Sequence, residues 1–110
     1  MPTAYKVLGQ VCPATTAATP LYTVASTTQV VVSSIAVANL ATASRTYRVA
    51  VRPNGATLAS LHYLAYDVTV AANDSTVITL GATLDTADVV DVRASAANDL
   101  AFTIFGAELT

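Results

Sequence analysis

The chain has 110 residues, of which 54% are hydrophobic and only 11% are charged, and its formal net charge is −2. The hydrophobic content excludes a disordered chain, because burial of so much apolar surface offsets the entropy lost on folding, and the length fits a single domain over residues 1–110. The weakly acidic balance gives no general attraction to phosphate backbones or anionic lipid, so neither nucleic acid nor a membrane surface is expected as a partner.

The scarcity of charge is the most unusual property of the sequence, because an ordinary soluble domain carries about 25% Asp, Glu, Lys and Arg. Thr, Ser and Ala can cover part of the surface, and we expect neighbouring subunits to cover the rest. Pro13 and Pro20 interrupt the longest uncharged interval, so no stretch approaches the roughly 18 apolar residues of a membrane-spanning helix. The first residues lack the basic and apolar regions of a signal peptide, so secretion by that route is not expected.

Strand signals begin at Tyr5–Val11, and a loop of Ala and Thr bracketed by prolines follows at residues 12–20. A short strand is expected at Leu21–Val24 and a longer one at Thr28–Ala38. The apolar residues of the longer strand cannot all lie on one face unless the register changes, so a β-bulge is expected near Ser33 and Ser34.

The segment Arg45–Arg52 alternates most clearly between apolar and polar residues, as in a half-solvated antiparallel strand. Pro53-Asn54-Gly55 then predicts a tight turn, because Asn and Gly tolerate positive φ. Leu61–Val70 is expected to form one long strand or two short ones, with Tyr63 and Tyr66 on opposite faces.

The last part of the chain predicts three strands, at Thr76–Leu80, Val89–Ala94 and Leu100 to about Ala107. Val, Ile and Thr dominate throughout, so eight or nine strands and no helices are expected. Without helices to cover a parallel sheet, the fold class is a single antiparallel β-sandwich, either jelly-roll or Ig-like. The predicted core is Val7, Tyr22, Val30, Ile35, Tyr47, Val49, Val51, Tyr63, Leu80, Val90, Val92, Phe102 and Ile104.

No catalytic or ligand-binding pattern stands out in the sequence. His62 has no partner at a telling spacing and is expected to pack in the core or at its rim, and the single Cys12 is interpreted as a buried or semi-buried small hydrophobe. Asp85, Asp88 and Asp91 do not form a recognised calcium-binding pattern and are interpreted as polar residues that end a turn and face solvent. We therefore expect no enzyme activity, no cofactor and no bound metal.

Three of the four arginines fall in one predicted strand, and Arg48 and Arg52 should share a face. They could form ionic contacts with a neighbouring subunit, or they could pair with Asp67 or Asp91 across the sheet. The loop at residues 12–20 has small side chains and no charge, which favours close contact with a neighbour. The candidate subunit-interface residues are Arg48, Arg52, Cys12, Pro13, Ala14, Thr15 and Thr16.

Five segments carry a resemblance that spans almost the whole chain. They are Tyr5-Lys6-Val7-Leu8-Gly9-Gln10, Leu21-Tyr22-Thr23-Val24 with the following strand to Ala38-Asn39, Tyr47-Arg48-Val49-Ala50-Val51-Arg52-Pro53-Asn54-Gly55, His62-Tyr63-Leu64-Ala65-Tyr66-Asp67, and Phe105-Gly106-Ala107-Glu108. With these segments the chain resembles small virion structural proteins of tailed bacteriophages, particularly those of cyanobacteria and marine bacteria.

The resemblance implies a non-enzymatic component of a virion, present in the host cytoplasm during assembly. It implies a cement or decoration protein that stabilises the capsid, bound to the major capsid protein as a homo-oligomer, with a trimer favoured at symmetric junctions. One alternative is a structural module attached to neck or tail proteins. Another is a carbohydrate-binding module for adsorption, although the chain has no Trp and its tyrosines mostly alternate into predicted core positions.

Overall fold

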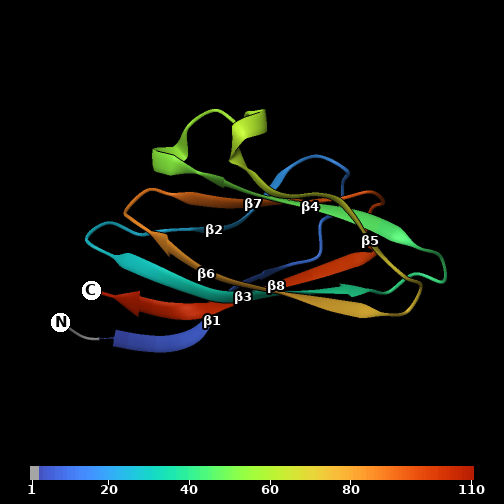
Figure 1. Ribbon diagram of the computed structural model, residues 1–110, viewed down its shortest axis with the longest axis horizontal. Helices are drawn as coiled ribbons and strands as arrows, with labels where there is room; N and C mark the ends of the chain where they lie inside the picture. Colours follow the sequence, from blue (N-terminus) through green and yellow to red (C-terminus); the bar gives the residue numbers. More distant parts are fainter. Residues whose placement is uncertain (1–2) are drawn as a thin grey trace.

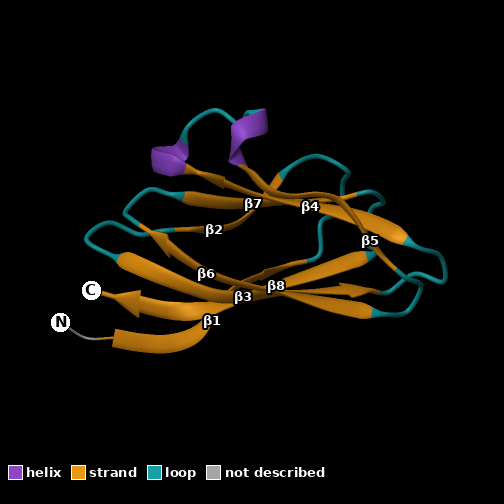
Figure 2. Ribbon diagram, viewed as in Figure 1, coloured by secondary structure: helices purple, strands orange, loops and turns teal. Residues whose placement is uncertain are grey.

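The computed structural model describes residues 3–110; Met1 and Pro2 of the expected domain 1–110 lie outside the described residues. Two layers of β-strands face each other, and both chain ends lie at the same end of the molecule (Figure 1). Figure 2 shows that strands make up most of both layers and that the helical turns sit together outside one of them. The fold is the antiparallel β-sandwich that the sequence predicts, with eight strands.

Each layer is a sheet of four strands. The first sheet has the order β1 (Thr3–Val11), β8 (Leu100–Leu109), β3 (Gln29–Asn39) and β6 (Ser75–Leu84). The second sheet has the order β2 (Thr19–Thr23), β7 (Val89–Ala94), β4 (Arg45–Arg52) and β5 (Tyr63–Val70). Two 3₁₀ turns, η1 (Pro53–Gly55) and η2 (Ser60–His62), lie between β4 and β5.

The pairing of the strands identifies the topology. β1 pairs with β8, β2 with β7, β3 with β6, and β4 with β5, all antiparallel. These are the pairs of one long hairpin rolled over a common core, which is the connectivity of the jelly roll. Of the two sandwich types expected from the sequence, the strand order is that of the jelly roll.

The core lies between the sheets and contains most of the residues predicted for it. The rings of Tyr47 and Phe102 meet edge to face across the core, with centroids 6.3 Å apart. The predicted residues that are buried are Val30, Ile35, Tyr47, Val49, Val90, Val92, Phe102 and Ile104, and those partly buried against them are Tyr22, Val51 and Leu80. Leu100 is fully buried and was not predicted.

The predicted bulge in β3 is confirmed. The register of β3 with both neighbours shifts between Val32 and Ser34. The shift lets Val30, Val32, Ile35 and Val37 all point into the core. Ser33 donates a hydrogen bond of 3.2 Å from its hydroxyl to the carbonyl oxygen of Phe105, which ties the bulge to the neighbouring strand.

Two of the predicted core positions are wrong. Val7 is 47% exposed, because the register of β1 shifts between Val7 and Gly9 and Leu8 packs against the core instead. Tyr63 is only half-buried and lies outside the core. The expectation that Tyr63 and Tyr66 lie on opposite faces is also wrong: their rings meet edge to face with centroids 4.9 Å apart. The pairing of β5 with β4 shifts register twice, which breaks the simple alternation of side chains.

The remaining differences concern element ends. The strand predicted at Thr76–Leu80 continues to Leu84, past Gly81, whose φ of 87° is readily available only to glycine. β2 begins at Thr19, so the irregular segment predicted at residues 12–20 ends earlier than expected. Arg45–Arg52 and Val89–Ala94 are strands with the predicted bounds, and Asn54 and Gly55 both adopt positive φ in η1.

Candidate functional site

The charged side chains of the strands are distributed unequally between the two sheets. On the second sheet, Arg48 in β4 and Arg93 in β7 are register partners, and both point away from the core. Asp67 in β5 accepts hydrogen bonds from Arg48 at 2.6 and 3.1 Å, and its Oδ1 lies 3.8 Å from Arg93 Nη1. The outer face of the second sheet therefore carries charged side chains, which are largely neutralised within the chain, although β5 at its edge also exposes Leu64 and Tyr66.

Arg48 and Arg52, the arginines proposed as interface residues, form ion pairs with aspartates across the sheet, which was the alternative to an interface role. Arg48 pairs with Asp67, and its guanidinium carbon also lies 3.9 Å from the centroid of the Tyr66 ring. The hydrogen bond from Arg48 holds the pKa of the Asp67 carboxyl below its ordinary value. Arg52 donates to Asp91 at 2.7 Å and to the carbonyl oxygen of Ala56 at 3.0 Å. Both side chains are thus engaged inside the subunit, and a role at an interface remains a prediction.

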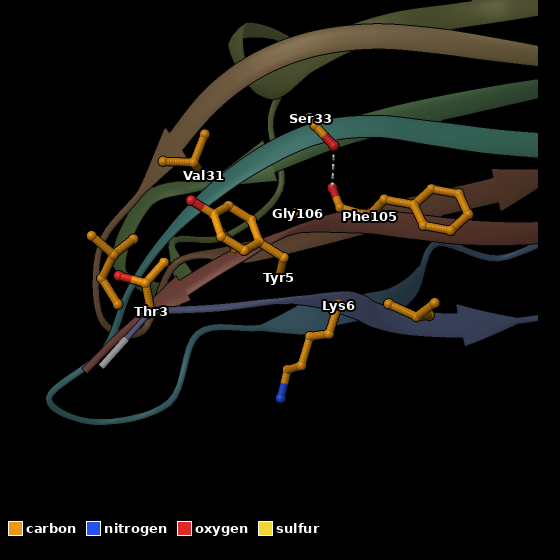
Figure 3. A pocket seen from close by; sticks show the side chains of 10 residues that line it. Thr3, Tyr5, Lys6, Val31, Ser33, Phe105 and Gly106 are labelled. Carbon is orange, nitrogen blue, oxygen red and sulfur yellow. Dashed lines mark hydrogen bonds between the residues drawn. The ribbon is translucent and has the colours of Figure 1, made fainter. Parts of the chain in front are cut away.

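The outer face of the first sheet is different, because among the described residues it carries no charged side chain. The four strands of this sheet contain two charged residues, Lys6 in β1 and Glu108 in β8. They pair with each other at 2.7 Å, on the side where Tyr22 of the second sheet donates to Glu108. Figure 3 shows Lys6 pointing away from Tyr5 and Thr3, on the opposite side of β1.

Apolar side chains occupy this uncharged face. Tyr5 is 86% exposed, and Val7, Val31 and Phe105 are exposed around it. They belong to three adjacent strands, β1, β3 and β8, and they border a shallow hollow of about 710 Å³. We call this surface the apolar face and define it by Thr3, Tyr5, Val7, Val31, Phe105 and Leu109 (Figure 3).

Gly106 allows the strands beneath the apolar face to approach closely. A Cβ atom at this position would lie 2.1 Å from the carbonyl oxygen of Val31 and 3.0 Å from a methyl carbon of Leu8. Any other residue would therefore push β8 and β3 apart. Gly106 itself lines the hollow together with Tyr5, Val31 and Phe105.

The loop predicted to lie on a neighbour is anchored at two points on its own subunit. The carbonyl oxygen of Pro13, a buried residue, accepts a hydrogen bond of 2.8 Å from the backbone of Asn98. The carbonyl oxygen of Thr16 accepts one of 2.9 Å from Arg93. Ala14, Thr15 and Thr16 have exposed side chains, and the structure does not bring this loop together with Arg48 and Arg52 into one site.

Cys12 is exposed, so its interpretation as a buried or semi-buried thiol is wrong. It follows the last residue of β1, where the chain leaves the sheet. His62 is buried, and its Nδ1 accepts a hydrogen bond of 3.0 Å from the backbone of Ala59, which closes η2. The histidine thus has a local structural role.

The three aspartates interpreted as turn residues do not gather their carboxylates into one site. Asp88 accepts backbone hydrogen bonds from Asn54 at 2.8 Å and from Asp85 at 2.9 Å. For Asp91 the interpretation as a solvent-facing turn residue is wrong: it lies within β7, is buried, and pairs with Arg52 of β4. Within residues 3–110 no group of three or more possible metal-ligating side chains comes together.

A second exposed surface lies beside η2. Tyr63 and Tyr66 border a hollow of about 560 Å³ together with Leu58, Ala59 and Ser60. The sequence predicts that the tyrosines mostly alternate into the core, and this pair does not. The exposed ring surface here is the kind of feature that stacks on a flat apolar ligand.

Sequence reasoning missed the apolar face. In β1 both sets of alternating residues contain apolar side chains, so Tyr5 and Val7 could have faced inward with Lys6 outside. The signal that was available is the placement of a tyrosine and a valine on either side of the lone lysine of an otherwise uncharged segment.

The comparisons with known proteins give no match, either to protein-family models or to curated proteins. In the part of the chain that the structure describes, no helix has the length and hydropathy needed to cross a membrane.

Proposed function

We propose that this protein is a non-enzymatic structural subunit of a tailed-phage virion and that it serves as a cement or decoration protein that stabilises the head. The observation that carries the proposal is the apolar face, an outer sheet surface that exposes Tyr5, Val7, Val31 and Phe105 and has no charged side chain among residues 3–110. Contiguous exposed apolar surface of this kind marks an interaction site in a folded protein.

The two faces of the sandwich support an attachment role. A subunit fixed to a particle needs one face that is compatible with burial and another that is compatible with water. The apolar face meets the first requirement, since covering it removes apolar surface from water without removing a charge. The ion pairs of Arg48 and Arg93 with Asp67 meet the second on the opposite sheet.

The assignment to a phage virion draws on the sequence resemblance, and the expected partner is the major capsid protein. Neck and tail proteins are the alternative partners, because an apolar sheet face would serve equally for attachment there. The particle's local symmetry differs between these places, so the position of the subunit distinguishes them.

A carbohydrate-binding role in adsorption is the second candidate, and one observation favours it. Tyr63 and Tyr66 form an exposed aromatic pair on the sheet opposite the apolar face, with Arg48 and Asp67 beside them. A subunit attached through the apolar face would leave this pair free to contact a host glycan.

The test is co-sedimentation of the recombinant subunit with purified virions from which the native subunit has been removed. We expect the wild-type protein to sediment with the particles and Val31→Asp to remain in the supernatant, because the new carboxylate would be buried without a partner. Thr69→Asp, an exposed position on β5 of the second sheet, is the matched control and should still bind.

Binding by Val31→Asp at the wild-type level would overturn the attachment face, and failure of the wild-type protein to bind would overturn the virion assignment. Electron microscopy of the reconstituted particles then shows whether the subunit occupies the head, neck or tail. If the wild-type protein binds a glycan but not the particles, and Tyr66→Ala abolishes the glycan binding, the result would instead support the carbohydrate-binding role.

A further inference from the structure

We propose that two copies of this chain associate through β1, pairing antiparallel about a two-fold axis at Tyr5, so that two first sheets become one eight-stranded sheet. The inference takes up the homo-oligomer expected from the sequence, deepens the proposed function by adding a contact between subunits, and names the partner as a second copy. It rests on three features of β1: an open edge, a self-complementary register, and an exposed aromatic ring at the centre.

β1 is an edge strand, hydrogen-bonded to β8 on one side. An edge strand presents backbone N–H and C=O groups that another strand can pair with. From Thr3 to Val7 its register with β8 is uninterrupted, running from Leu109 to Phe105. This stretch has no proline and one charged residue, Lys6, so it lacks most of the devices that prevent edge pairing.

The other sheet edges in the described chain carry such devices. β2 is five residues long and contains Pro20, which has no N–H to donate. β5 contains Asp67 with a φ of 52° and shifts register twice against β4. β6 contains Gly81 with a φ of 87°, next to the register shift at the β3 bulge. The stretch Ser75–Thr79 of β6 is also uninterrupted, but β1 is the edge that carries an exposed aromatic ring, Tyr5, at the centre of such a stretch.

The sequence of β1 suits pairing with itself in one register. A two-fold axis at Tyr5 places Tyr5 opposite Tyr5 and Thr3 opposite Val7, all on the apolar face. On the other side it places Ala4 opposite Lys6, so no like charges are directly opposed.

The neighbouring registers are less favourable. An axis at Ala4 would pair only Thr3–Tyr5 of the described residues, so Val7 would have no described partner. An axis at Lys6 would put two ammonium groups opposite each other, which destabilises a strand pair. An axis at Val7 would run the ladder through the register shift that follows this residue. A slip by one residue would set the apolar face of one copy against the inner side of the other.

The association would cover the most exposed aromatic side chain of the first sheet. Tyr5 is 86% exposed in the single subunit, and in the pair each Tyr5 ring packs beside its symmetry mate. The hollows beside the two Tyr5 residues then join into one larger apolar surface for attachment.

A two-fold contact gives a dimer. We therefore propose a dimer in place of the trimer that was expected from the sequence.

The decisive experiment uses opposite charges at position 5, measured by sedimentation equilibrium. Tyr5→Asp and Tyr5→Lys should each weaken self-association about tenfold or more, because each puts like charges at the axis and removes the apolar contact. An equimolar mixture should recover dimers that contain one copy of each variant, since residue 5 then meets a residue of opposite charge. Val77→Asp and Val77→Lys, at a 61% exposed valine on the β6 edge, are the matched controls and should dimerise like the wild-type chain.

A cross-linking measurement tests the register independently. Directly opposed residues of an antiparallel pair have Cα atoms about 4.5–5.5 Å apart, within the range of a disulfide. Tyr5→Cys in a Cys12→Ser background should therefore form a disulfide-linked dimer under mild oxidation, and Val77→Cys in the same background should not. In the wild-type pair the two Cys12 residues would lie about 46 Å apart and should not cross-link.

A wild-type chain that is monomeric at its solubility limit, or that forms a trimer, would overturn the inference, as would a charge mixture that recovers no dimer. These outcomes are distinct from failure of the proposed function. A dimer that does not bind virions would refute the attachment and leave the β1 contact standing, whereas a monomer that binds virions would do the reverse.

Discussion

The hydroxyl of Tyr22 in β2 donates a hydrogen bond of 2.5 Å to Oε2 of Glu108 in β8, and this contact links the two sheets at the edge of the sandwich. Lys6 Nζ lies 2.7 Å from the other oxygen of the same carboxylate. The hydrogen bonds from Lys6 and then from Tyr22 lower the pKa of Glu108 below its ordinary value of 4.5. Burial, followed by the bond to Glu108, raises the pKa of Tyr22, so the phenol remains a donor at neutral pH.

The lowered pKa of Glu108 predicts a pH dependence of stability. A carboxyl group whose pKa is lower in the folded state stabilises the fold above its unfolded pKa, and this contribution disappears as the pH falls through the folded value. We expect Glu108→Gln to reduce the free energy of unfolding by about 1–2 kcal/mol at neutral pH. Urea denaturation between about pH 7 and pH 3 should show the wild-type and variant curves converging at the acid end. Parallel curves would contradict the role assigned to this carboxylate.

Gly106→Ala should destabilise the subunit strongly. The new Cβ would lie 2.1 Å from the carbonyl oxygen of Val31, so two strands would have to separate, at a cost of about 3 kcal/mol. Gly81→Ala is the matched control: nothing lies within 4 Å of its Cβ, and only the strain of a φ of 87° remains, about 1–2 kcal/mol. Urea denaturation of the two variants compares them directly, and equal losses would show that crowding beneath the apolar face is not the cause.

Local alternation predicts most of the strand segments, but not the start of β5, where Leu61 and His62 belong to η2, or the end of β6. The bounds of β4 and β7 follow from apolar and polar residues at a period of two, and the β3 bulge follows from four apolar residues that must all face one side. Strand order did not follow, because it depends on pairings such as β1 with β8 between opposite ends of the chain. Both sandwich types have similar strands, so only the pairing separates them.

The apolar face was beyond sequence reasoning for a related reason. Whether Tyr5 or Lys6 faces the inner side of β1 is decided by Glu108 and Tyr22, which hold the ammonium group on that side. Neither contact can be inferred from the residues around Lys6. The candidate arginines show the opposite case, since the across-sheet partners Asp67 and Asp91 were named correctly from the charge pattern.

Arg52 and Arg48 should differ in their effect on stability. Arg52→Ala would leave the carboxylate of Asp91, a residue only 5% exposed, without its partner and would remove the hydrogen bond to the carbonyl oxygen of Ala56, just after η1. We expect a loss of about 3 kcal/mol in the free energy of unfolding, as for other buried ion pairs broken on one side. Arg48→Ala should change stability much less, because Asp67 remains open to water. Chemical denaturation of each single variant measures these losses of stability.

If the two arginines also lie at the rim of a subunit interface, the double variant Arg48→Ala/Arg52→Ala should bind particles modestly less well than the wild-type protein. The stability of the single variants shows whether such a loss of binding comes from unfolding or from the interface.

The loop predicted at residues 12–20 offers a test of attachment that needs no substitution. Ala14, Thr15 and Thr16 have exposed side chains, while Pro13 and Thr16 hold the loop to its own subunit through backbone carbonyls. Exposed loop tips with small residues are preferred sites of proteolysis. We expect elastase, which cleaves after small side chains, to cut this loop in the isolated subunit and to spare it on the virion, with mass spectrometry of the fragments identifying the site. Cutting at the same rate in both forms would show that the loop does not lie on a neighbour, and protection in both would show that its two anchors alone are enough to shield it.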